Sequence, residues 1–390
     1  MNYYAINFYK KLRTNYRLII LLLILFSIPN ENNYKFRTNA DDETLISVNK
    51  HNEQFYIHGI HLTAWKAGSK QFRKKIEKYL SEDKCNTLVI AVKEYTGEVY
   101  IPDVDQVKEL GSFVNAIPDI KQFINILKSK KIYTIARIVV FKDNIAARKR
   151  SSWAIKTPDG TLWTDYKGIT WLDPYNKETW DYNISIAEQC ANLGFDEIQF
   201  DYIRFPSDGD IKTCRYSQHH SSITAIKCIS DFLKEAKTRI KSKYNVNISV
   251  DIFGLTTSVF HDMGIGQNII CITDIVDYVC PMLYPSHYNK GELGIPDPNK
   301  SPYETVFRSL SDASKRLGKN YIKLRPYLQD FSLGYKYGIK EVEQQIRACY
   351  DNNIFKWTLW NPTMNYTFDI FEKDFINNIQ ERYYIEFSSK

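Results

Sequence analysis

The strongest constraint on the fold is an alternation of short apolar runs with segments of helical periodicity from residue 55 onward. The runs are rich in β-branched and aromatic residues, which predicts eight strands at residues 56–65, 87–95, 133–141, 197–205, 248–255, 278–284, 323–331 and 356–360. Apolar spacing of three and four predicts helices at residues 69–82, 118–130, 176–192, 221–242, 264–276, 302–317, 338–352 and 368–381.

Strands that alternate with helices pair in parallel and are joined by right-handed crossovers. Eight such units over ~310 residues predict a single α/β domain at residues 55–385, a (β/α)₈ barrel of the TIM type. The alternative is an open doubly wound sheet, which usually carries a glycine-rich phosphate loop after its first strand. The segment after Trp65 reads Lys-Ala-Gly-Ser and has no G-x-G-x-x-G motif. The barrel is therefore favoured, and no cofactor is implied.

Residues 1–29 have the pattern of a signal peptide or signal anchor. Four cations and no acid precede an apolar stretch at residues 18–28, which is shorter than the ~20 residues that a membrane-spanning helix needs. The polar, aperiodic residues 30–54 predict a linker. We expect an extracytoplasmic protein, either secreted or tethered to the membrane through residues 18–28. The alternative for this stretch is a buried core strand or helix.

Charge and cysteine content exclude some classes of protein. The four N-terminal cations, Lys10, Lys11, Arg13 and Arg17, make up more than half of the net charge of +7, so nucleic-acid binding gains no support. The 14% aromatic content suits a protein whose rings stack on sugars. The seven cysteines include no C-x-x-C motif, and we expect most of them to be small buried side chains. A Cys214–Cys228 disulfide is left open.

Polar residues gather at the carboxyl ends of the predicted strands, where barrel enzymes place their chemistry. Asp201, flanked by aromatic residues in the fourth strand, is the strongest catalytic candidate, because a buried carboxylate must have partners. Asp251 in the fifth strand and Glu94 at the end of the second are its candidate partners. Two carboxyl groups across a cleft can cleave a glycosidic bond, with an outcome set by their separation. The alternative role for Asp201 is a structural ion pair with Arg137. For Asp251 the alternative is a hydrogen bond within the core, and for Glu94 it is a salt bridge at the rim of the barrel.

Further residues near strand ends are candidates for substrate contacts. Polar side chains that could hold sugar hydroxyls or orient carboxylates are Arg137, Arg204, Gln199, Gln329, Asp330 and His287. Aromatic candidates for stacking on sugars are Trp65, Trp163, Trp171, Tyr284 and Trp360. Residues 142–175 would form a long connection that contains three tryptophans. The alternative for any of these rings is that it packs the loop onto the barrel.

Histidine spacing does not indicate a metal site. His58 and His61 are three residues apart in a predicted strand and should point to opposite faces. The pair His219–His220 has no evident partners, and the chain has no H-E-x-x-H motif. A serine hydrolase is not indicated either, since no G-x-S-x-G motif occurs.

The chain resembles a bacterial extracytoplasmic family of glycosyl hydrolase-like domains. The segments that carry the resemblance run in order along the chain after residue 55: GIHLTAWKAGS, LVIAVKEYTGEV, ARIVVFKD, LWTDYKG, WLDPYNKETWDYNISIA, GFDEIQFDYIRFPSDG, DIFGLTTS, DMGIGQ, PMLYPSHY, RPYLQDF and LWNP. The resemblance implies a TIM barrel similar to α-amylase-like and chitinase-like enzymes, with the family's characteristic strand-4 Asp at Asp201. Glu94 is a departure, since the family usually has Asp there.

The comparison with chitinases fails at two positions. Gln199 and Ile203 replace an Asp and the acid Glu of the chitinase motif D-G-x-D-x-D-x-E, so a substrate-assisted mechanism is not expected. An α-amylase-like pattern, with acids on strands 4, 5 and 7, fits Asp201, Asp251 and Asp330 better, although it is an analogy between folds.

The hypothesis from sequence is therefore an exported, monomeric glycoside hydrolase that acts on a cell-surface or extracellular polysaccharide. Asp201 would be the nucleophile or general base, and Asp251, or else Glu94, the general acid. The alternative is a catalytically inactive carbohydrate-binding or cell-envelope protein on the same barrel.

Overall fold

Eight parallel strands close into a barrel in chain order, with β8 paired to β1. The computed structural model describes residues 56–372. The strands are β1 (Ile57–Leu62), β2 (Thr87–Lys93), β3 (Tyr133–Val139), β4 (Glu197–Asp201), β5 (Asn247–Phe253), β6 (Tyr278–Leu283), β7 (Tyr327–Gln329) and β8 (Lys356–Trp360). The predicted (β/α)₈ fold is confirmed, and each predicted run coincides with one strand, although β5 begins one residue before its predicted run. The predicted signal or anchor and the whole of the predicted linker lie outside the described residues.

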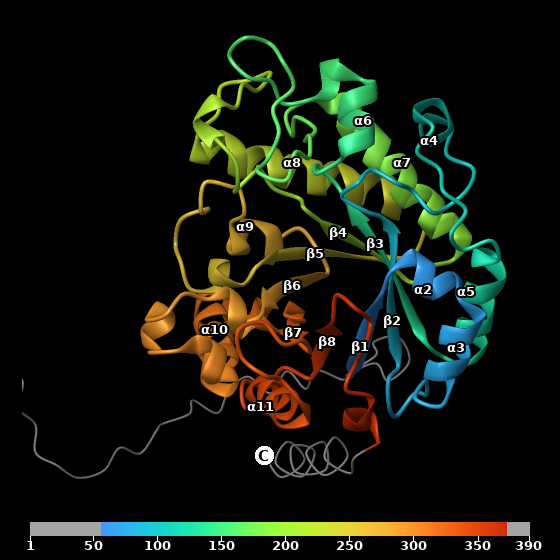
Figure 1. The fold of residues 1–390 in the computed structure, drawn as a ribbon, viewed down its shortest axis with the longest axis vertical. Helices are drawn as coiled ribbons and strands as arrows, with labels where there is room; N and C mark the ends of the chain where they lie inside the picture. Colours follow the sequence, from blue (N-terminus) through green and yellow to red (C-terminus); the bar gives the residue numbers. More distant parts are fainter. Residues whose placement is uncertain (1–55, 373–390) are drawn as a thin grey trace, which may run out of the picture. The chain divides into compact units, whose positions relative to one another are not determined.

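Helices surround the strands on the outside of the barrel (Figure 1). The longer ones are α3 (Lys70–Glu77), α5 (Ile120–Ser129), α7 (Lys177–Leu193), α8 (Ser222–Lys241), α10 (Pro302–Leu317) and α11 (Ile339–Tyr350). Short helices are α2 (Ala64–Gly68), α4 (Asp105–Leu110), α6 (Asn144–Lys149) and α9 (Ile269–Thr273). Within residues 56–372 we find no helix that combines the length and apolar character needed to cross a bilayer.

Two predicted helices differ from the structure. A helix was expected at residues 264–276, but α9 has only five residues, because Gly264 and Gly266 adopt positive φ values before it. Asp262 accepts a hydrogen bond from the Gly266 N–H, and Asn268 then caps the helix. Of the helix expected at residues 368–381, the described part is a 3₁₀ turn at Phe368–Phe371. The remainder lies outside the described residues.

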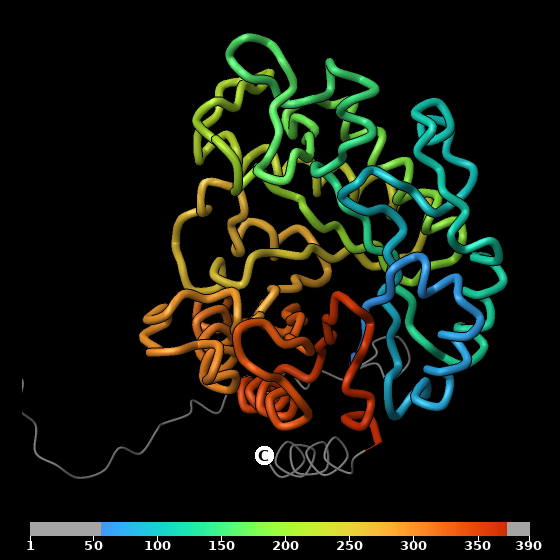
Figure 2. The backbone as a smooth tube through the Cα atoms, viewed as in Figure 1, coloured from blue at the N-terminus to red at the C-terminus, as the bar shows by residue number. Residues whose placement is uncertain are grey.

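The long connection after β3 packs against the loop after β4. Figure 2 shows these two segments, green and yellow-green, side by side at the top of the view. A bridge joins Lys156 to Arg215, and the Trp163 indole N–H donates to the Asp210 carbonyl at 3.0 Å. The loop is therefore a second layer over the carboxyl ends of β3 and β4.

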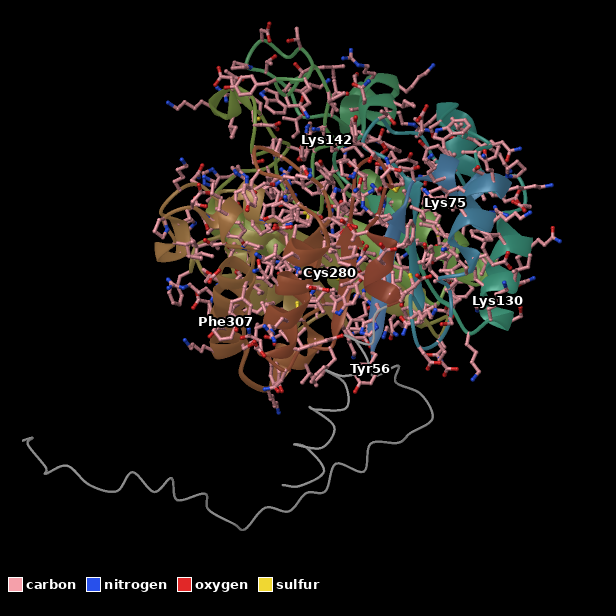
Figure 3. The ribbon with its side chains drawn as sticks, turned by 60° about the horizontal axis from the view of Figure 1, so that its bottom comes forward. Tyr56, Lys75, Lys130, Lys142, Cys280 and Phe307 are labelled. Atoms are coloured by element: carbon pink, nitrogen blue, oxygen red, sulfur yellow. The ribbon has the colours of Figure 1, made fainter. Side chains whose placement is uncertain are left out.

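The barrel interior is layered and partly polar. An apolar group of Val89, Ile135, Cys280, Tyr284 and Tyr327 comes from β2, β3, β6 and β7, and Cys280 lies among the strands in Figure 3. Interior layers of this kind fill a barrel of eight strands.

At the amino ends of the strands the interior holds a buried ion pair between Glu197 and Arg325, whose side chains are both fully buried. Glu197 also accepts hydrogen bonds from the hydroxyl groups of Tyr133 and Ser249. The pair therefore links β3, β4 and β5 to the segment that leads into β7.

Replacing Arg325 by Met should lower the free energy of unfolding by about 3–5 kcal/mol, because Glu197 would remain buried without its cation. The double variant Glu197→Leu/Arg325→Met removes both charges and should lose less, as measured by urea unfolding. Arg239→Met is the control, because Arg239 pairs with acids at the surface and should cost at most about 1 kcal/mol. Equal losses in the single and double variants would contradict this account.

Candidate active site

Three carboxyl groups converge on one guanidinium at the carboxyl ends of the strands. Arg137, on β3, donates from Nε and Nη2 to Asp201 Oδ2 at 3.0 and 2.5 Å. Its Nη1 lies 3.5 Å from Glu94, and its Nε lies 3.9 Å from Asp251 Oδ2. The structure therefore brings together the three predicted catalytic residues and the predicted partner Arg137; we call these four residues the mouth cluster.

The Asp201 carboxylate is held by its own backbone turn as well as by Arg137. Its Oδ1 accepts a hydrogen bond from the Tyr202 N–H at 2.6 Å. Tyr202 has a φ of 48°, a left-handed conformation that is costly for an aromatic residue. Strain of this kind persists where the surroundings impose it, and it often occurs at functional sites. Tyr202 is one of the two aromatic residues that flank Asp201 in the sequence, and the sequence analysis assigned it no role.

The carboxyl groups of the mouth cluster differ in protonation and exposure. Burial, and then the negative charge of Asp201, raises the pKa of Asp251 well above its ordinary value. Burial alone would lower the pKa of Arg137, but the carboxylates, Asp201 first, raise it well above its ordinary value. The Glu94 side chain is 19% exposed and that of Asp251 only 2%. The arrangement thus combines a carboxylate held by a cation with a neighbouring carboxyl group, Asp251, whose raised pKa favours the protonated form.

The shared guanidinium also limits the distance between the two carboxyl groups. Asp201 Oδ2 and Asp251 Oδ2 lie 3.0 and 3.9 Å from the same Nε atom, so they are no farther apart than these two distances together. Carboxyl groups lie about 5–5.5 Å apart in retaining glycosidases and about 6.5–9.5 Å apart in inverting ones. The upper limit here excludes most of the inverting range.

His61, which the sequence analysis considered only as a metal ligand, lies beside the mouth cluster. It is fully buried, its ring centroid is 4.3 Å from that of Trp360, and neither ring nitrogen has a hydrogen-bond partner within residues 56–372. Burial, and then the charge of Arg137, lowers the pKa of His61 well below its ordinary value, so the imidazole is neutral. His58 lies on the opposite face and bonds to Tyr350, as the strand alternation predicted.

Lys142 and Arg204 flank the mouth cluster. Lys142, at the end of β3, lies 2.6 Å from Asp165, and its ammonium group faces the rings of Trp171 and Tyr202. The Arg204 guanidinium also faces these two rings, each at 4.9 Å. The side chains of Lys142 and Arg204 thus both contact Trp171 and Tyr202.

Other predicted substrate residues have partners inside the protein. Gln199 accepts from the Tyr327 hydroxyl and donates to Cys280, below the mouth cluster. Gln329 accepts from the Ser286 N–H and donates to the Phe331 carbonyl. Asp330 accepts from the N–H and hydroxyl of Thr367, and burial raises its pKa to about 6. These contacts explain why the structure does not present the three side chains at the mouth.

The aromatic candidates divide into buried and accessible rings. Trp163 and Trp171 are buried, and the Trp171 indole N–H lies 3.3 Å from Asp165, so both pack the loop onto the barrel. Trp65 is 61% exposed on α2, directly after β1. Tyr284 is buried, and its ring centroid lies 5.3 Å from that of the exposed His287. Trp360 is half-buried and faces Arg137. Of the tryptophans, Trp65 and Trp360 are therefore the accessible surfaces near the mouth.

Neither metal ligation nor the cavity in the structure accounts for the mouth cluster. Within residues 56–372 no group of His, Cys, Asp and Glu side chains has the geometry to hold a metal ion. A cavity of about 300 Å³, lined by Gln106, Ser185 and Tyr244 among others, includes no member of the cluster. The chemistry proposed for the cluster is therefore based on its three carboxyl groups and the Arg137 guanidinium.

The comparison with solved structures supports the barrel fold. The glycoside hydrolase domain of PgaB from Bordetella bronchiseptica has 11% identity and a TM-score of 0.62 over 83% of this chain and 98% of that chain. A maltogenic α-amylase, AmyB, from Thermotoga neapolitana has 12% identity and a TM-score of 0.50 over 84% and 75%. A hypothetical protein from Ruminiclostridium thermocellum is 30% identical over 49% of this chain and 96% of that chain, with a TM-score of 0.43.

No curated protein matches the chain. The family model described as "Putative glycosyl hydrolase domain" matches residues 59–366 and thus includes every strand from β2 to β8 and most of β1. This match confirms, at the level of the family, the prediction of a glycoside hydrolase with a carbohydrate substrate. The chain belongs to this glycosyl hydrolase domain family.

Proposed function

We propose that this protein cleaves glycosidic bonds of a cell-surface or extracellular polysaccharide by a two-carboxylate mechanism. The observation that carries the proposal is the convergence of Asp201 and Asp251 on the Arg137 guanidinium, with Asp251 held in its protonated form. A carboxyl group with a raised pKa beside a carboxylate that accepts hydrogen bonds from a guanidinium is the pairing that a general acid and a nucleophile require.

In the proposed reaction Asp251 donates its proton to the leaving glycosidic oxygen, and the bond from that oxygen to the anomeric carbon breaks. Asp201 attacks the anomeric carbon and forms a glycosyl ester, which water hydrolyses after the deprotonated Asp251 accepts a proton from it. The upper limit on the carboxyl separation favours this retaining course over one in which Asp201 activates water.

Arg137 has a positioning role in this scheme. By donating to Asp201 Oδ2 it fixes one carboxylate oxygen, and the Tyr202 N–H fixes the other. A preorganised carboxylate needs little rearrangement as positive charge develops on the sugar. Trp65, exposed next to β1, offers a flat surface for a sugar ring.

Asp201→Asn should lower the rate of polysaccharide cleavage by at least about 10²–10⁴-fold, because the amide can neither attack nor accept a proton. The measurement is release of reducing ends from a panel of envelope and extracellular polysaccharides. Asp181→Asn on the exposed side of α7 is the matched control and should cleave like the wild type. Equal cleavage by Asp201→Asn and the wild type would remove Asp201 from the mechanism. Binding without cleavage by the wild type would favour the alternative of an inactive carbohydrate-binding protein.

The pH dependence of kcat/KM tests which carboxyl group is the general acid. Asp251 must keep its proton to act, so kcat/KM should fall as pH rises through its raised pKa. Asp251→Asn should be slower by about 10²–10⁴-fold and lack this alkaline fall, whereas Glu94→Gln should retain it. Glu94 is the more exposed group and is the alternative acid. An alkaline fall of kcat/KM that disappears in Glu94→Gln and persists in Asp251→Asn would assign the role of general acid to Glu94.

We also propose that the protein is exported and works as a monomer. Support for export comes from the four cations and the apolar stretch at residues 18–28. Residues 1–54 fused to a reporter enzyme that is active only outside the cytoplasm should produce reporter activity. A fusion retained in the cytoplasm would contradict export, and it would leave the proposed chemistry of the barrel unaffected.

A further inference from the structure

Arg204 is a buried cation without a carboxylate partner. It is 6% exposed, and within residues 56–372 its guanidinium makes one hydrogen bond, from Nη1 to the Phe205 carbonyl at 2.9 Å. The other two buried arginines of the barrel differ, since Arg137 is paired with Asp201 and Arg325 with Glu197. A buried charge without such a partner is costly, so its presence requires a reason.

Aromatic rings surround this guanidinium. Its Cζ lies 4.6 Å from the ring centroid of Phe253 and 4.9 Å from those of Trp171 and Tyr202. The π face of an aromatic ring attracts the cation but supplies no lone-pair acceptor for its N–H groups. Nε and Nη2 make no hydrogen bond within the described part of the chain, and they retain some contact with solvent, unlike Nε of Arg325.

Most of the acids that influence Arg204 already have cations of their own. Asp201 is paired with Arg137, and Asp165 with Lys142 at 2.6 Å. Asp208 also attracts Arg204 but lies beyond ion-pair distance. Within residues 56–372 the free edge of the guanidinium therefore has no acid within ion-pair distance.

The position of Arg204 relates this free edge to the proposed chemistry. Arg204 follows Asp201 by three residues. The charges of Asp201 and Arg204 both influence the pKa of Tyr202, which lies between them in the chain, and the Arg204 guanidinium faces the Tyr202 ring. Lys142 faces the same rings of Tyr202 and Trp171, but its ammonium group is paired with Asp165 at 2.6 Å, so within residues 56–372 Arg204 is the cation on these rings that lacks a carboxylate partner. A ligand group bound here would lie beside the carboxylate that attacks the substrate.

We propose that the substrate carries an anionic oxygen group, a carboxylate or a phosphate, on a sugar next to the cleaved bond, and that the free edge of Arg204 binds it. A planar guanidinium matches two oxygens of such a group with two parallel N–H bonds, and neutral hydroxyl groups do not supply that charge. The inference rests on the proposed function, because it names the substrate class of the same site.

The experiment measures binding of oligosaccharides to the full chain carrying Asp201→Asn, which prevents turnover. The probes are oligosaccharides of galacturonic acid, a polymer of sugar phosphates, and neutral glucose oligomers, titrated calorimetrically at low and high salt. At least one anionic probe should bind about 10–100-fold more tightly than the neutral oligomers, with less discrimination at high salt. The anionic probe that binds more tightly shows whether the anionic group of the substrate is a carboxylate or a phosphate.

Arg204→Gln in the same background should remove this discrimination, and Arg204→Lys should retain only part of it, because an ammonium keeps the charge but loses the planar fork. Arg308→Gln is the matched control, since Arg308 also donates to a backbone carbonyl but lies exposed on α10. It should leave the discrimination unchanged. Circular dichroism checks the fold of each variant. If Arg204→Gln does not fold, the comparison of Arg204→Lys with the parent tests the inference instead.

Equal binding of neutral and anionic probes by the parent, or discrimination that persists in Arg204→Gln, would overturn the inference. The two proposals fail in distinguishable ways. Cleavage of neutral polysaccharides by the wild type without anion selectivity would leave the proposed function standing and remove only the role of Arg204. Anion selectivity without cleavage of any probe by the wild type would contradict the proposed function instead.

Discussion

The site depends on the burial of the Arg137 guanidinium at the carboxyl ends of the strands. Removing this cation from water is costly, and the attraction of the neighbouring carboxylates, Asp201 first, offsets that cost. The same arrangement leaves Asp251 buried next to the charge of Asp201, which raises the pKa of Asp251 and favours its protonated form. One ion-pair network thus stabilises the barrel mouth and gives two neighbouring aspartates different environments, on which the proposed roles of acid and nucleophile rest.

A second buried pair, Glu197 with Arg325, closes the opposite end of the barrel interior. Between the two ion pairs lie Gln199, Tyr327 and Cys280, which are linked by hydrogen bonds. The two buried charges and these polar side chains therefore stabilise one another along the barrel interior. Against this background Arg204 is exceptional, because its edge remains unpaired while the other buried arginines in the barrel have carboxylates.

The sequence predicted the strands well because each is a short, strongly patterned run that must be buried on both faces. It predicted helices less well where local turns intervened, as at Gly264 and Gly266, whose positive φ values shorten α9. Asp201, Asp251 and Glu94 could be found because carboxyl groups at strand ends are rare in such apolar surroundings. Trp163 and Trp171 could not be separated from exposed rings, since their burial depends on how the loop after β3 folds back. His61 and Tyr202 were missed because their roles depend on environment and backbone conformation.

The amino-acid sequence by itself determined the barrel, the order of its strands and which acids stand at their carboxyl ends, because periodicity and residue type are local properties of the chain. Only the tertiary structure decided which of these acids share a cation, which one keeps its proton and which arginine is left with a free edge. Those properties depend on distances between side chains from different strands and on the water that packing removes around them. For this chain, burial and pairing in three dimensions separate the proposed reacting groups from those that support the barrel.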